Sequence, residues 1–135
     1  MTAQVTYDGA LRTAATHLKS GNQIITDAPT DNYGKGEAFS PTDLVATALA
    51  SCLLTVMGIR AEKMGLNMDG ARANVNKIMA SNPRRIQRVE ITVQMPTDQH
   101  FSDDHRKLLE RIARTCPVAN SLHTDLEQVL DFKWD

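Results

Sequence analysis

The spacing of apolar and polar residues changes along the chain and predicts strands first, then a long helix, then further strands and a second helix. In residues 3–17, two short apolar runs flank the pair Asp8–Gly9, and Lys19–Asn22 marks the next reversal before a third run. Such pairs connect antiparallel strands, so we expect a three-stranded meander at the N-terminus. A polar, glycine-containing loop, residues 29–38, follows it.

The central segment, from Ser40 to the terminating Gly65, carries helix signals at both ends. Ser40 suits the N-cap, Pro41 suits the first turn, and Asp43 places a negative charge near the helix N-terminus. Apolar residues then cover nearly every face of the helix over residues 44–59. A domain of this size rarely buries a helix completely. We therefore expect a long, buried central helix that a second copy of the chain covers, in a homodimer.

In the C-terminal half, strand-like alternation of apolar residues is again followed by helical spacing. Residues 71–81 form a strand candidate, and residues 88–95 alternate cleanly between apolar and polar positions. Ser102 caps a second helix, whose apolar stripe we expect to include Cys116. Pro117 breaks or restarts that helix, and residues 127–135 offer a closing strand. No repeat or linker divides the chain, so residues 1–135 are expected to form a single domain.

The composition argues against a nucleic-acid partner. The 15 basic and 16 acidic residues nearly cancel and are spread along the chain, and aromatic residues make up 4%. This leaves neither an electrostatic footprint nor stacking platforms for a nucleic acid, so no nucleic-acid partner is expected.

The apolar run is also unlike a membrane span. It is shorter than the roughly 20 residues that cross a bilayer, and Thr47, Ser51 and Thr55 interrupt it. The first residues resemble no signal peptide. We expect a cytoplasmic protein without a membrane partner, in which both cysteines are free thiols at rest.

The two cysteines are the candidate reactive groups. A reactive thiol must ionise, and Cys52 lies about three turns inside the helix, beyond the reach of the helix dipole and among apolar residues that oppose ionisation. A reactive Cys52 therefore needs a cation from elsewhere, for which an arginine held by a carboxylate is well suited. The alternative is that Cys52 and Cys116 are both inert core residues.

Other motifs point to no further chemistry. The four histidines lack metal-ligand spacing, Gly34–Gly36 matches no nucleotide-binding pattern, and the chain has no GxSxG hydrolase elbow. We expect no metal and no cofactor.

Two stretches resemble one known family. Residues 37–52, EAFSPTDLVATALASC, and residues 116–122, CPVANSL, are similar to the OsmC/Ohr family of osmotically inducible and organic hydroperoxide resistance proteins. In that family one cysteine lies in a long central helix and a second precedes a proline. The resemblance implies an α+β, OsmC-like fold, an intertwined homodimer with its sites at the subunit interface, and reduction of organic hydroperoxides by thiol chemistry.

The resemblance also implies roles for individual residues. Cys52 would be the peroxidatic cysteine and Cys116 the resolving one, joined in a disulfide after the sulfenic acid forms. A dithiol or lipoyl-type reductant would reset the pair. Arg12 matches the arginine that activates the thiol in the family.

One position departs from the family. Its helix begins with an NPE-like sequence, whereas this chain has Thr42 where the glutamate would stand. Glu37 in the preceding loop and Asp43 are the candidates to replace that carboxylate, and Asp43 is also explained as a helix N-terminal charge. The alternative function is therefore a non-enzymatic, stress-associated OsmC-like dimer that binds a small apolar ligand at its interface.

Overall fold

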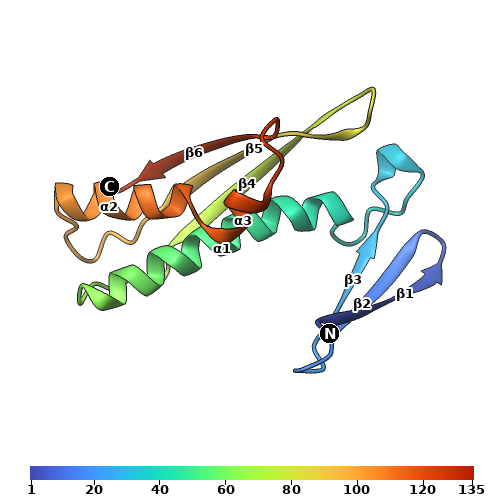
Figure 1. The fold of residues 1–135 in the computed structure, drawn as a ribbon, viewed down its shortest axis with the longest axis horizontal. Coiled ribbons are helices and arrows are strands. Elements are labelled where there is room, and N and C mark those ends of the chain that lie inside the picture. Colours follow the sequence, from blue (N-terminus) through green and yellow to red (C-terminus); the bar gives the residue numbers. More distant parts are fainter. The chain divides into compact units, whose positions relative to one another are not determined.

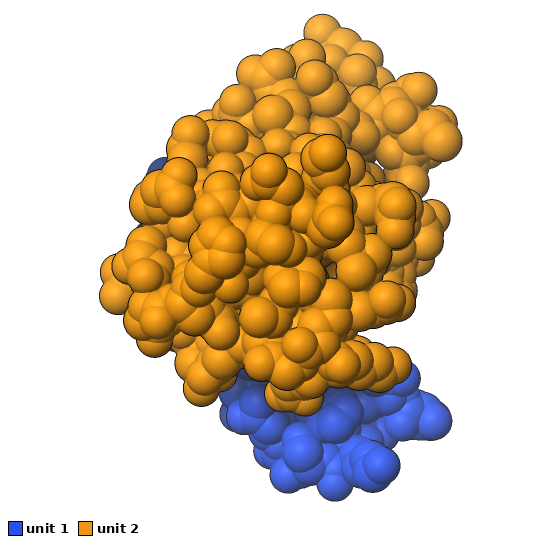
Figure 2. Space-filling view, turned by 90° about the vertical axis from the view of Figure 1, so that its left-hand side faces the viewer, with its two compact units in different colours: residues 1–45 blue, residues 46–135 orange.

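The structure is a computed structural model that describes all 135 residues. The chain divides into two compact units, residues 1–45 and 46–135, which are coloured separately in Figure 2. That the two form a single domain stays a prediction. The elements labelled in Figure 1 are β1 (Ala3–Gly9), β2 (Arg12–His17), β3 (Gln23–Asp27), α1 (Pro41–Lys63), β4 (Arg72–Ala80), β5 (Arg85–Gln94), α2 (Asp103–Arg114), α3 (Pro117–Ser121) and β6 (Glu127–Lys133). A short 3-10 helix, η1 (Thr30–Asn32), follows β3.

The first unit contains the predicted meander. Its sheet has the order β1-β2-β3, with antiparallel pairing throughout. The first turn is displaced from the predicted Asp8–Gly9 pair, because Ala10 and Leu11 occupy the two turn positions and both have positive φ, 54° and 63°. A register shift between Tyr7 and Gly9 accounts for the displacement, since the irregularity takes up Asp8 within the strand.

The loop after β3 folds tightly on itself. The Gly34 amide donates to the Pro29 carbonyl at 2.9 Å, and the Gly36 amide donates to the Ala28 carbonyl at 3.2 Å. A Cβ atom at position 34 would lie 1.7 Å from the Ala28 carbonyl oxygen, so only glycine fits there. The loop is therefore a defined turn that leads the chain from β3 towards Glu37.

The ends of α1 are as predicted. The Asp43 amide donates to Ser40 Oγ at 3.1 Å, and the Ser40 amide donates to the Asp43 carboxylate at 3.0 Å, which is a reciprocal capping box. At the other end the helix stops at Lys63, and Gly65 follows with φ 72°.

Burial of α1 in one chain is confined to one face, unlike the complete burial that its apolar sequence predicts. The buried positions recur at helical spacing, whereas Val45 and Ile59 are 37% and 52% exposed. By length and hydropathy alone α1 could cross a bilayer, a test that the core helix of a water-soluble protein also passes. Its buried face belongs to the protein core, and its buried residues are Ala46, Leu49, Ala50, Leu53, Met57 and Ala61.

The second unit is built on a sheet of order β4-β5-β6, with β4 antiparallel and β6 parallel to β5. A parallel neighbour needs a crossover, which α2 and α3 supply. Figure 1 shows α1 and α2 on the same side of this sheet. The predicted alternation in β5 directs Val89, Ile91 and Val93 to that side, where they are buried with Leu53 of α1 and Leu109 of α2.

The prediction for the second helix is right at its start and wrong at its end. The Ser102 side chain accepts a hydrogen bond from the His105 amide, which confirms the N-cap. Cys116 is buried as expected, yet it does not continue the stripe of α2. That helix ends at Arg114, and Cys116 is the N-cap of α3, whose first residue is Pro117.

Candidate functional site

The two cysteine side chains lie near one another. Cys52 is half-buried on α1, and Cys116 is 1% exposed at the N-cap of α3. Both are free thiols, and Cys52 is near enough to Cys116 to affect the pKa of the Cys116 thiol. Two residues that are far apart in sequence are thus held close enough to act on one another.

Burial and the neighbouring thiol act together on Cys116. Burial raises the pKa of Cys116 above its usual range, and hydrogen bonding and charge interaction with Cys52 raise it further. The amide groups of Ala119 and Val118 oppose this effect, and the Ala119 amide donates to Cys116 Sγ at 3.4 Å. Cys116 is therefore mainly a neutral thiol at neutral pH, which suits a second nucleophile better than a first one.

Arg12 is held by a buried carboxylate in the first unit. Its Nε atom donates to Asp27 Oδ1 at 2.7 Å, and its Nη2 atom donates to Asp27 Oδ2 at 2.8 Å. Asp27 is 1% exposed, and the two residues are direct cross-strand partners on β2 and β3. This two-pronged geometry fixes the plane of the guanidinium and holds the pKa of Asp27 below its usual range.

Glu37 adds a second carboxylate to Arg12. Its Oε2 atom lies 3.2 Å from Arg12 Nη2, and its side chain is 67% exposed. The Glu37 amide also donates to Asp27 Oδ2 at 3.2 Å, so the folded loop is tied to the same pair. The two carboxylates together raise the pKa of Arg12, with Asp27 making the larger contribution. The structure thus brings together the predicted residues Arg12 and Glu37.

Asp27 is not among the residues predicted from the sequence. The predicted meander could have indicated it, because a reversal at residues 19–22 pairs Arg12 with Asp27 in an antiparallel register. Asp43, the other candidate carboxylate, takes part in the capping box of α1. The carboxylates on Arg12 are those of Asp27 and Glu37.

The arginine group and the thiols lie in different units. Arg12, Asp27 and Glu37 belong to residues 1–45, and Cys52 and Cys116 belong to residues 46–135. The action of Arg12 on Cys52 therefore stays a prediction.

Three of the histidines take part in local structure. His105 completes the cap of α2, because its Nδ1 atom accepts from the Ser102 amide at 3.4 Å. His17 Nδ1 lies 2.6 Å from Ser20 Oγ, and His123 Nδ1 accepts from the Asp125 amide at 3.0 Å. These ring nitrogens have partners within a few residues of their own positions.

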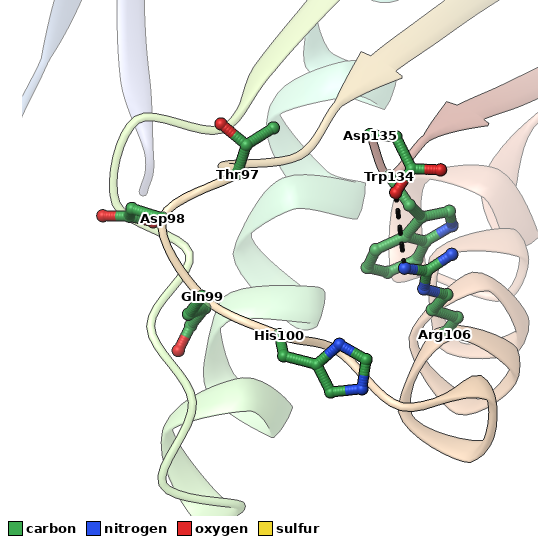
Figure 3. Close-up of a pocket in the computed structure, with 7 residues that line it drawn as sticks. All are labelled: Thr97, Asp98, Gln99, His100, Arg106, Trp134 and Asp135. Atoms are coloured by element: carbon green, nitrogen blue, oxygen red, sulfur yellow. Dashed lines mark ion pairs between the residues drawn. The ribbon is translucent and has the colours of Figure 1, made fainter.

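A cavity of about 540 Å³ lies away from the predicted site residues, none of which lines it. Figure 3 shows the loop after β5 on one side and Arg106 beside Trp134 on the other. The Arg106 guanidinium lies 5.6 Å from the centre of the Trp134 ring and 3.6 Å from the Asp135 carboxylate, and Trp134 Nε1 donates to Glu110. The polar groups at this end of the cavity already satisfy one another, so the cavity does not compete with the two thiols as the candidate site.

Comparison with known proteins gives the family. The model of the OsmC-like protein family matches residues 34–128, which include both cysteines. No protein with a curated description matches the chain.

Solved structures agree over nearly the whole chain. One solved structure is of a protein from Psychrobacter arcticus that is named an osmotic stress induced and detoxification response protein. It is 51% identical to this chain and has a TM-score of 0.94, and the match covers 98% of this chain and 96% of that one. Two organic hydroperoxide resistance proteins share the fold at 14% identity. The one from Legionella pneumophila has a TM-score of 0.76 over 98% of this chain and 97% of its own. The one from Elizabethkingia anophelis has a TM-score of 0.75 over 100% and 97%.

The shared fold and the family match over most of the sequence agree with one another. The chain belongs to the OsmC-like protein family.

Proposed function

We propose that this protein is a cytoplasmic, homodimeric, thiol-dependent peroxidase that reduces organic hydroperoxides to alcohols. The observation that carries the proposal is that two free thiols, Cys52 on α1 and Cys116 at the N-cap of α3, lie near one another. Two members of the same fold are named organic hydroperoxide resistance proteins, which supports the choice of substrate class.

The proposed cycle uses both sulfurs. The Cys52 thiolate attacks the terminal oxygen of the hydroperoxide, the O–O bond breaks, and the alkoxide takes a proton to leave as the alcohol. The resulting Cys52 sulfenic acid is attacked by the sulfur of Cys116. The S–S bond forms as the hydroxyl of the sulfenic acid leaves as water with the proton of the Cys116 thiol. A dithiol or lipoyl-type reductant then returns both residues to thiols and is itself oxidised to a disulfide.

Arg12 is proposed to supply the positive charge that Cys52 needs. Cys52 lies well inside α1, where the helix dipole contributes little. Arg12 is permanently charged, and its pairing with Asp27 and Glu37 orients the guanidinium before any substrate binds. Glu37 is proposed to take the place of the family glutamate that Thr42 replaces.

A homodimer is supported by the apolar side chains that one chain leaves exposed. Val45 and Ile59 are exposed on α1, and Val5, Tyr7 and Ile24 are exposed on the first sheet. A second copy of the chain would remove such surface from water.

Turnover with matched variants tests the proposal. Consumption of cumene hydroperoxide is followed with dihydrolipoamide as the reductant. We expect turnover by the wild type, none by Cys52→Ser, and a single sulfenic acid that can be trapped in Cys116→Ser. The variant Arg12→Lys keeps the charge but loses the two-pronged pairing, so its first step should be slower. Lack of turnover by the wild type, with both thiols unmodified, would favour the alternative, a dimer that binds an apolar ligand without catalysis.

A further inference from the structure

The helix that carries Cys116 is too short to be stable by itself. α3 has five residues, and the hydrogen bond from the Asn120 amide to the Cys116 carbonyl, at 3.0 Å, closes its first turn. Isolated helices need about 12–15 residues to be even marginally stable in water. The position of Cys116 Sγ therefore depends on contacts that reach α3 from other parts of the protein.

Gln128 makes one of these contacts from β6. The alternation in this strand directs Gln128, Leu130 and Phe132 to the partly buried side, and Glu127, Val129 and Asp131 to solvent. A glutamine in a row with leucine and phenylalanine needs a hydrogen-bond partner. Gln128 Nε2 donates to the Ala119 carbonyl of α3 at 3.1 Å.

Ala119 connects this contact to the sulfur. Its carbonyl accepts from Gln128, and its amide donates to Cys116 Sγ at 3.4 Å. Ala119 is itself buried, so α3 is held on both its polar and its apolar sides. A chain of two hydrogen bonds therefore runs from β6, through one residue of α3, to the second thiol.

We propose that Gln128 is a positioning residue for Cys116, which holds α3 in place so that the disulfide with Cys52 closes quickly. This role rests on the proposed function, since closure of the disulfide is its second step. If the hydrogen bond from Gln128 is lost, α3 is less firmly held and Cys116 Sγ spends less time within reach of Cys52. The first step, attack of Cys52 on the hydroperoxide, does not involve α3 and keeps its rate.

The variant Gln128→Met tests the inference with little change in volume. Methionine has a similar length and no donor, and a hollow of about 210 Å³ lined by Arg114, Gln128 and Leu130 leaves it room. The variant Gln128→Glu also keeps the length, and it offers no donor when ionised. Gln94→Met is the matched control, because Gln94 Nε2 donates to the carbonyls of Met95 and Lys133 elsewhere on the same sheet.

Two reactions are followed in each variant by rapid quenching and mass spectrometry. With cumene hydroperoxide, formation of the Cys52 sulfenic acid and closure of the disulfide are timed separately. With diamide, a thiol oxidant that is not a peroxide, one thiol first adds to the N=N bond. The other thiol then attacks the sulfur of this adduct and releases the hydrazine, and closure is timed from the adduct. We expect closure to be about three- to ten-fold slower in both Gln128 variants under either oxidant, the range expected for one lost hydrogen bond. Sulfenic acid formation, and both steps in Gln94→Met, should stay within about two-fold of the wild type.

Local amide exchange gives a second readout. The amide hydrogens of residues 117–121 should exchange faster in Gln128→Met, while those of α1 and β5 keep their protection. Unchanged closure with diamide, or equal slowing of both peroxide steps, would overturn the inference. If the wild-type disulfide closes quickly with diamide but the protein does not react with cumene hydroperoxide, the proposed function is overturned. The positioning role of Gln128 is then decided by the diamide rates of the variants.

Discussion

Truncation of Leu53 to alanine tests the packing that places Cys52. Leu53 is fully buried between α1 and the second sheet, next in sequence to the half-buried thiol. The change removes three carbon atoms, about 2.4 kcal/mol at roughly 0.8 kcal/mol for each buried methylene. The cavity that remains adds to this loss, so the expected total is about 3–5 kcal/mol. That is a large part of the roughly 5–15 kcal/mol that stabilises a typical domain.

Urea unfolding followed by circular dichroism measures the effect. With a slope of about 2 kcal/mol per molar urea, the midpoint should fall by about 2 M. The control is Glu62→Ala on the same helix, where the side chain is exposed and the change in stability should stay within about 0.5 kcal/mol. Equal losses for the two variants, or a larger one for Glu62→Ala, would refute the one-sided packing of α1.

Three further predictions concern the first unit and the dimer. The pKa of Asp27 is lowered in the folded state, so its stabilising effect is complete above the ordinary aspartate pKa of about 3.9 and is lost as the pH falls through the lowered value. Asp27→Asn should therefore reduce the drop in urea midpoint between pH 7 and pH 3, and an identical drop in both proteins would contradict this. Ala10 and Leu11 both have positive φ, so the double change Ala10→Asn and Leu11→Gly should raise the stability by about 1 kcal/mol, measured as the urea midpoint; a lower midpoint would count against this turn geometry. If a second chain covers α1, Ile59→Asp should give a smaller particle by analytical ultracentrifugation, whereas an unchanged mass would place the dimer contact elsewhere.

Much of the fold was predictable because its local signals agree with one another. Ser40 and Ser102 cap their helices, the alternation over residues 88–95 gives a strand buried on one side, and Pro117 begins a new helix. The first turn was predicted two residues too early, because Asp8–Gly9 has the sequence of a turn while strand register decides where the chain reverses.

The sequence indicates which residues belong to the candidate site better than it indicates which of them lie close together. The cysteines could be named from their surroundings, but their proximity depends on how distant parts of the chain pack together, which no short stretch of sequence determines. Asp27 was missed because a carboxylate at the end of an apolar strand looks like an ordinary loop residue. Its role follows only from its register opposite Arg12.

The most direct test of the central claim is to count free thiols after one equivalent of cumene hydroperoxide, and to map the peptides without reduction. We expect both thiols to disappear together, and Cys52 and Cys116 of the same chain to be found in one disulfide-linked peptide pair. Two thiols that survive the peroxide, or a Cys52 oxidised to sulfinic acid beside an intact Cys116, would contradict that claim.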